Sequence, residues 1–181
     1  LRRALNANLP EDIVVIEVQD APPGFHAIAH TVRKRYGYVI QDGPRRDVFV
    51  RQHAWFVPQR LDVAAMKQAA SALVGRHDFA SFQASGSNRV STVRTIYCLE
   101  VERRAGEFLD RVHIAVEADG FLYNMVRIIV GTLVAVGRGR RPIEWVQQVL
   151  TSRDRRLAGM TAPPQGLYLL KVWHEGMTNE E

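Results

Sequence analysis

The chain has 181 residues, 46% of them hydrophobic, and a formal net charge of +5, so it is long enough to bury the core of one domain. It contains no run of eighteen apolar residues, and we therefore expect no membrane span. Cys98 is the only cysteine, which excludes an intrachain disulfide and favours a reducing, cytoplasmic compartment. The six histidines include no H-E-x-x-H motif, and we expect no metal site.

The basic residues are almost all arginines, with Lys34, Lys67 and Lys171 as the exceptions. Arginine is suited to phosphate groups because its planar guanidinium donates two parallel hydrogen bonds. The composition therefore favours a nucleic-acid partner. The charge alone is weak evidence, since many basic proteins bind no nucleic acid.

The first half of the chain predicts two strands and a helix. Residues 1–10 lack an initiator Met and resemble the end of a helix, so we expect upstream residues to be absent from this chain. Alternating β-branched residues predict a strand at 12–19, and a second, longer strand is predicted at 27–41. Asp62 predicts the N-cap of a helix that runs to about Val74.

The second half predicts two strands, two helices and a closing strand. The strands are expected at 93–102 and 108–117, joined by a turn at 104–107. An apolar helix at 121–136 follows, then a helix opened by Pro142 and a last strand at 166–173. Strands interspersed with helices predict an α+β fold, with an antiparallel or mixed sheet on which helices pack.

The apolar helix carries a single arginine, Arg127, near its middle. With 3.6 residues per turn, the arginine shares a narrow stripe with small or polar neighbours, namely Gly120, Tyr123, Asn124 and Gly131. An unpaired buried guanidinium costs several kcal/mol, so we expect Arg127 to face a carboxylate, a phosphate or a solvent-filled cleft. The alternative is a structural ion pair, or an arginine whose head group reaches solvent.

Basic and aromatic residues alternate in the second predicted strand. Tyr36 and Tyr38 share one face with Lys34, and Arg33 and Arg35 lie on the other. Such a strand could neutralise a nucleic-acid backbone and stack on an exposed base. An ordinary half-buried strand with its aromatic residues in the core is the alternative.

A loop rich in proline and glycine precedes the last strand, and by itself it would be an ordinary tight turn. In combination, however, several independent motifs resemble the tRNA pseudouridine synthase A family, in order and over nearly the whole chain. They include Leu5-Asn-Ala-Asn-Leu-Pro-Glu-Asp-Ile13, Arg35-Tyr36 with Tyr38, Gly75-Arg-His-Asp-Phe79, Met125-Val-Arg127, Val130-Gly-Thr-Leu133 and Thr161-Ala-Pro-Pro-Gln-Gly-Leu-Tyr168.

The resemblance implies conversion of uridine to pseudouridine, without a cofactor, at positions 38, 39 and 40 in the anticodon stem-loop of tRNA. In this reaction the N1–C1′ bond breaks, the uracil turns, and C1′ is rejoined through C5. The base must first leave its stack. The resemblance further implies a homodimer that holds the RNA in a basic cleft.

The resemblance also assigns roles to individual residues. Tyr36 would stack on the flipped uridine, Arg127 would pair with the nucleophilic aspartate, and Leu167 and Leu169 would form the apolar wall of the pocket. The RNA backbone would meet the basic residues at 33–35. The family's nucleophile lies in a motif of the type G-R-T-D-x-G-V-H, which this chain does not contain. We therefore expect the chain alone to be inactive.

The resemblance suggests a division of the chain into three parts. Residues 1–24 would be a remnant of the N-terminal subdomain, residues 25–176 a largely complete C-terminal subdomain of the pseudouridine synthase fold, and residues 177–181 a flexible tail. The alternative function is a non-catalytic RNA-binding domain. A globular domain with no nucleic-acid role would require the whole series of motifs to be coincidence.

Overall fold

A computed structural model describes residues 1–86, 91–106 and 109–177. The last residue of the predicted turn at 104–107, the first residue of the strand at 108–117 and most of the predicted tail fall outside these ranges. The helices and strands are α1 (Arg2–Asn6), β1 (Thr31–Asp42), β2 (Trp55–Val57), α2 (Val63–Ala70), β3 (Gly75–Asp78), β4 (Val93–Arg104), β5 (Arg111–Ala118), α3 (Met125–Gly137), α4 (Trp145–Ser152) and β6 (Leu167–His174).

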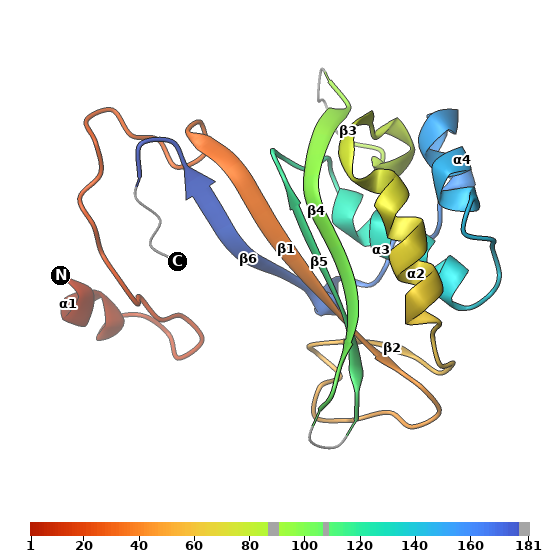
Figure 1. Cartoon of the computed structure of the whole chain (residues 1–181). Coiled ribbons are helices and arrows are strands. Elements are labelled where there is room, and N and C mark those ends of the chain that lie inside the picture. The colour runs from red at the N-terminus through yellow and green to blue at the C-terminus, as the bar shows by residue number, and fades with distance from the viewer. Residues whose placement is uncertain (87–90, 107–108, 178–181) are drawn as a thin grey trace.

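The strands form one mixed sheet in the order β2-β1-β5-β4-β3, and β6 pairs with β1 as well. Among the described residues only the short β1–β2 pairing is parallel, and the other pairings are antiparallel. Helices α2, α3 and α4 gather on one side of this sheet (Figure 1). The predicted α+β class, with helices packed on a mixed sheet, is therefore confirmed.

The core lies between this sheet and its helices. Along β5 every second residue is buried, from Val112 to Ala118, and the residues between them are partly exposed. Eleven of the thirteen residues of α3 are buried, and Arg127 and Ala135 are the exceptions. No helix in the described residues is both long enough and apolar enough to cross a bilayer.

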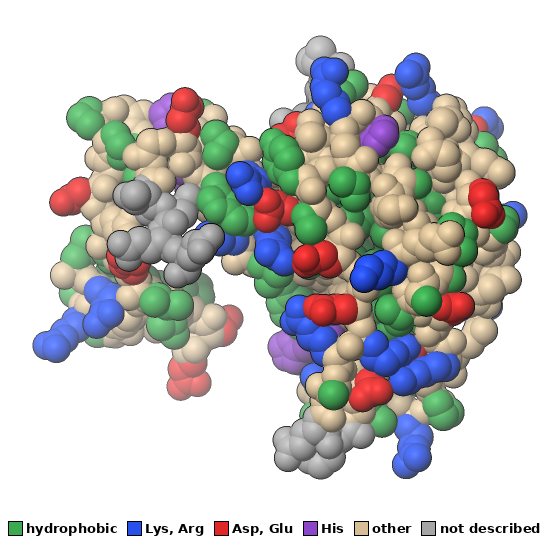
Figure 2. All heavy atoms as spheres, viewed as in Figure 1, with side chains coloured by type: hydrophobic (Ala, Val, Ile, Leu, Met, Phe, Trp, Pro, Cys, Tyr) green, Lys and Arg blue, Asp and Glu red, His purple; other side chains and the backbone are tan. Residues whose placement is uncertain are grey.

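The N-terminal thirty residues include no buried residue. The predicted strand at 12–19 is wrong, because these residues form an extended loop that pairs with no strand in the described structure. The amide of Val15 instead donates to the side-chain oxygen of Asn6 at 2.7 Å, and Ile16 is 80% exposed. The segment lies beyond β6, away from the main body (Figures 1 and 2). Alternation alone could not show that a partner strand was missing.

Two helices begin later than the sequence predicted. Helix α3 begins at Met125 rather than at residue 121, because Asn124 has a φ of 58° and cannot belong to a right-handed helix. Pro142 does not open α4 directly: its carbonyl accepts a hydrogen bond from Trp145, where the helix begins. The predicted N-cap at Asp62 is confirmed, since its carboxylate accepts from the amide of Ala65 at 2.9 Å.

Candidate active site

Arg127 lies in the first turn of α3 and is only partly buried. Its Nε donates to the carbonyl of Ala162 at 2.6 Å, and its Nη1 donates to Oδ1 of Asn124 at 2.9 Å. Among the described residues no carboxylate forms an ion pair with it. The guanidinium is thus held in place by neutral acceptors. The structural ion pair considered from the sequence is not found in the described part of the chain.

The predicted stripe of small and polar residues around Arg127 exists only in part. Gly120, Tyr123 and Asn124 precede the helix, and the Tyr123 side chain is exposed. Gly131 is buried, and a Cβ there would lie 1.8 Å from the carbonyl oxygen of Met160. The glycine therefore lets the backbone of the 158–166 loop touch α3.

That loop joins Arg127 to the sheet. The Ala162 amide donates to the Arg127 carbonyl at 3.0 Å, so these two residues exchange two hydrogen bonds. The next residue, Pro163, accepts a hydrogen bond from the Tyr38 hydroxyl at 2.6 Å. Gly166 packs directly on the ring of Tyr38, where a Cβ would lie 2.7 Å from ring atoms. The loop thereby fixes the distance between α3 and β1.

Tyr38 is a buried hydrogen-bond donor beside the arginine. Burial raises the pKa of its phenol far above the ordinary range, although the nearby charge of Arg127 acts in the opposite direction. The phenol therefore remains protonated at physiological pH and keeps its hydrogen bond to Pro163. Its role in the site is to position the loop that carries Ala162.

The three residues predicted to hold the base lie together on β1 and β6. Tyr36 is paired with Leu169, and Tyr38 is paired with Leu167. Side chains directly opposite each other on antiparallel strands share one face of the sheet. The Tyr36 ring meets the Phe121 ring edge to face, with centroids 5.1 Å apart. Since Leu169 is 54% exposed, this end of the strand pair presents an aromatic and an aliphatic side chain to solvent.

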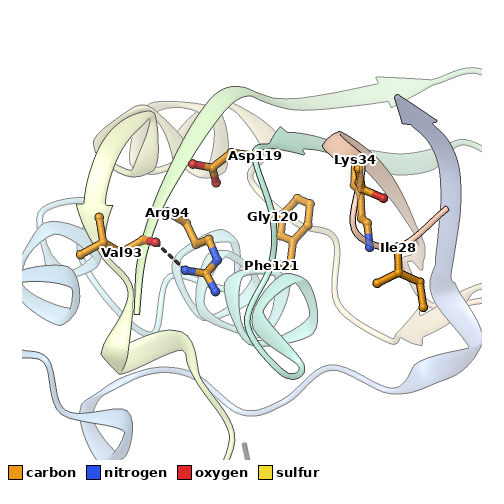
Figure 3. Close-up of a pocket in the computed structure, with 8 residues that line it drawn as sticks. Ile28, Lys34, Val93, Arg94, Asp119, Gly120 and Phe121 are labelled. Carbon is orange, nitrogen blue, oxygen red and sulfur yellow. Dashed lines mark hydrogen bonds between the residues drawn. The ribbon is translucent and has the colours of Figure 1, made fainter. Parts of the chain in front are cut away.

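The predicted RNA-binding residues do not lie together. Arg33 forms an ion pair with Glu117 at 2.8 Å, and Arg35 forms one with Glu100 at 3.0 Å. As alternate residues of β1, they occupy the face opposite Tyr36, as the sequence predicted. In the space-filling view, basic and acidic side chains are interleaved along the sheet, with no continuous basic stripe (Figure 2). Lys34, in contrast, lines a pocket beside Phe121 (Figure 3).

Four residues of the arrangement had no assigned role in the sequence analysis. Asn124 and Ala162 hold the guanidinium, Pro163 holds Tyr38, and Phe121 packs on Tyr36. An asparagine just before a helix was a usable signal, because asparagine tolerates the left-handed conformation better than most residues. The backbone carbonyls of a distant loop give no signal in the sequence.

Comparison of the sequence with known proteins identifies a family. The family model described as tRNA pseudouridine synthase matches residues 69–174. The chain is 48% identical over 169 residues to tRNA pseudouridine synthase A of Thermoanaerobacter sp. (strain X514), which covers 93% of this chain and 68% of that relative. Identity to the protein of the same name from Geobacillus sp. (strain WCH70) is 43%, over 96% of this chain and 68% of that relative. The chain belongs to the tRNA pseudouridine synthase family.

Proposed function

We propose that this chain carries the uridine-holding part of a tRNA pseudouridine synthase that acts on positions 38–40 of the anticodon stem-loop. The observation that carries the proposal is Arg127, a guanidinium held in a partly exposed position by Asn124 and Ala162 without a carboxylate from the described residues. A guanidinium in such a position, with one of its nitrogens still free of an acceptor in the described structure, can bind a further anionic partner.

The chemistry that this site would serve is an isomerisation. The N1–C1′ bond of uridine breaks and a C5–C1′ bond forms, while the proton on C5 leaves and N1 takes up a proton. Atoms and electrons balance without an oxidant or a second substrate, so the proposed reaction needs no cofactor. It does need a carboxylate close to the sugar and the base, and a cation that keeps this carboxylate ionised.

Arg127 can supply that cation. Its Nε and Nη1 are engaged by Ala162 and Asn124, which leaves Nη2 with no acceptor among the described residues. A carboxylate that binds Nη2 would complete the hydrogen bonding of the guanidinium and have its own pKa lowered. We propose that this carboxylate is the nucleophilic aspartate and that it comes from a segment outside these 181 residues.

Tyr36 and Leu169 would hold the base. Uracil taken out of its stack needs an apolar or aromatic surface to offset the lost stacking. The half-buried Tyr36 ring, braced by Phe121, and the exposed Leu169 side chain offer that surface on neighbouring strands. Leu167, opposite Tyr38, would extend the apolar wall toward Arg127. We further propose a homodimer, as the family resemblance implies.

The alternative is a non-catalytic RNA-binding domain, and the observation in its favour is that no carboxylate of the described residues pairs with Arg127. The two are separated by an assay for pseudouridine in the anticodon arm of tRNA. The chain alone should form none, whereas the chain joined to a segment that carries the G-R-T-D-x-G-V-H motif should form it. Pseudouridine formed by the chain alone would contradict the assignment of the aspartate. No product from the joined protein would favour the binding domain.

A further inference from the structure

A pocket of about 400 Å³ opens where β1 and β4 begin and β5 ends (Figure 3). Two cationic side chains, Lys34 and Arg94, line it from opposite strands, and the ring of Phe121 lies between them. Thr31 contributes to the wall, and Asp119 is its one acidic residue. We call this site the Lys34–Arg94 pocket.

The two cations are available to a ligand. The Lys34 side chain forms no hydrogen bond or ion pair with any described residue. Arg94 uses Nη1 to donate to the carbonyls of Ser91, at 3.1 Å, and Val93. These bonds orient its guanidinium toward the pocket and leave Nη2 and Nε without a carboxylate partner among the described residues.

The acidic residue does not neutralise the pair. Asp119 accepts a hydrogen bond from the Thr95 amide at 3.0 Å, and its own amide donates to the Thr95 carbonyl. Its carboxylate is therefore tied to the β4 backbone and forms no ion pair with Lys34 or Arg94. The pocket keeps an excess of one positive charge, with its two cations aimed at one space.

The pocket also adjoins the candidate active site. Phe121 lines the pocket, and the same ring contacts the Tyr36 ring with centroids 5.1 Å apart. Lys34 and Tyr36 lie two residues apart on β1, which separates their Cα atoms by about 7 Å. Successive phosphates of an extended RNA strand are separated by a similar distance. A nucleotide held at Tyr36 would thus place a neighbouring phosphate at the pocket.

We propose that the Lys34–Arg94 pocket binds the backbone phosphate of a nucleotide adjacent to the target uridine. This inference rests on the proposed function, because it requires an RNA whose base is held at Tyr36. A phosphodiester suits the site, since two cationic donors can share its two free oxygens while Phe121 packs against the ribose. The pocket would fix the position of the RNA strand relative to β1, so that one base reaches Arg127.

Arg33 and Arg35 provide a matched comparison on the same strand. Both are already paired with acids, Glu117 and Glu100, on the opposite face of the sheet. If the RNA runs through the pocket, these two arginines lie on the wrong side of β1 to touch it. The same number of positive charges can therefore be removed on each face.

The test measures binding of an anticodon stem-loop RNA by fluorescence anisotropy over a series of salt concentrations. The double variant Lys34→Gln, Arg94→Gln should bind about ten-fold or more weakly, and the slope of log K against log salt should fall by about one to two. The double variant Arg33→Gln, Arg35→Gln should stay within about two-fold of wild type. A second control, Arg140→Gln with Arg141→Gln, removes two charges beyond the far end of α3.

The possible results separate the pocket assignment from the proposed function. If the pocket variant binds like the two controls while wild type binds RNA, the pocket assignment is wrong and the proposed function stands. If wild type binds no RNA at low salt, the proposed function and this inference both fail. Arg94 is half-buried, so Lys34→Gln alone is measured in parallel. Because the Lys34 side chain makes no ion pair in the described structure, this single change should weaken binding about three-fold or more without altering thermal stability.

Discussion

Asn124 holds Arg127 with the side-chain oxygen that would ordinarily cap the helix. The residue stands at the N-cap of α3, yet its side chain accepts no capping hydrogen bond and instead accepts from Arg127 Nη1 at 2.9 Å. Its backbone has a φ of 58°, in the left-handed region. Both features weaken the start of the helix, and both serve to place the guanidinium.

Substitution of Asn124 separates the hydrogen bond from the backbone conformation. Asn124→Gly and Asn124→Ala both remove the bond to Arg127, but only alanine adds the cost of a left-handed residue with a Cβ. The alanine variant should therefore have a free energy of unfolding about 1–2 kcal/mol lower than the glycine variant, measured with urea. In the chain joined to the segment that we propose carries the aspartate, both variants should form pseudouridine more slowly. Wild-type rates for the glycine variant would show that Arg127 does not need Asn124.

Arg127→Met tests whether the guanidinium stabilises the chain. From the sequence, an uncompensated charge would make this variant as stable as wild type or more so. The structure predicts the reverse, because Ala162 is buried and its carbonyl would lose its donor. We expect the free energy of unfolding to fall by about 1–3 kcal/mol. Arg127→Lys, which keeps the charge but cannot reach both acceptors with a planar fork, is the control. Unchanged stability in both variants would mean that the two hydrogen bonds contribute nothing net.

Local sequence signals predicted most elements of this fold. The Asp62 cap, the alternation in β5 and the apolar periodicity of α3 each reflect a preference that burial reinforces. The strand predicted at 12–19 failed because alternation reports an amphipathic segment, whereas a strand also needs a neighbour for its backbone. In the described residues that neighbour is missing, and an asparagine side chain replaces it.

The sequence predicted the functional side chains of the site, but not the groups that hold these side chains in place. The sequence indicated Arg127 as a site residue because burying its charge would be costly. The two-residue period of a strand placed Tyr36 on the other face of β1 from Arg33. The sequence could not show that Arg33 pairs with an acid on β5 and Arg35 with one on β4, because cross-strand register depends on the whole sheet. The carbonyls that hold Arg127 and Tyr38 come from a loop that only the tertiary structure brings near.

Gly131→Ala tests the contact between α3 and that loop. A Cβ at this position would lie 1.8 Å from the Met160 carbonyl oxygen, so the loop would have to move. We expect a loss of about 3 kcal/mol in the free energy of unfolding, despite the better helix propensity of alanine. Gly120→Ala is the matched control, since the nearest atom there is Arg94 Nε at 3.5 Å, an ordinary contact. Equal stability of the two variants would contradict the close packing of the loop on the helix.

Asp42 joins the end of β1 to β4 and to the residues before α2. Its side chain is fully buried, and its carboxylate accepts hydrogen bonds from Arg103 Nη1 and Nη2 at 2.7 and 2.9 Å and from the Leu61 amide at 2.7 Å. Burial alone would raise the pKa of this carboxyl. The hydrogen bonds from Arg103 and Leu61, with the charges of Arg103 and Arg60, outweigh burial and hold the pKa below its ordinary value.

The lowered pKa of Asp42 sets the sign of a pH dependence. A carboxyl whose pKa is lower in the folded than in the unfolded chain stabilises the fold above its unfolded pKa, near 4, and loses this contribution as the pH falls further. Asp42→Asn should cost about 2–3 kcal/mol at neutral pH, since the partly buried Arg103 would lose its charged hydrogen-bond partner. The gap between wild type and this variant, measured with urea at successive pH values, should narrow below about pH 4. Glu100→Gln, which breaks an exposed pair with Arg35, should change stability little at any pH. A gap for Asp42→Asn that stays constant from neutral to strongly acidic pH would show that ionisation of this carboxyl does not stabilise the fold.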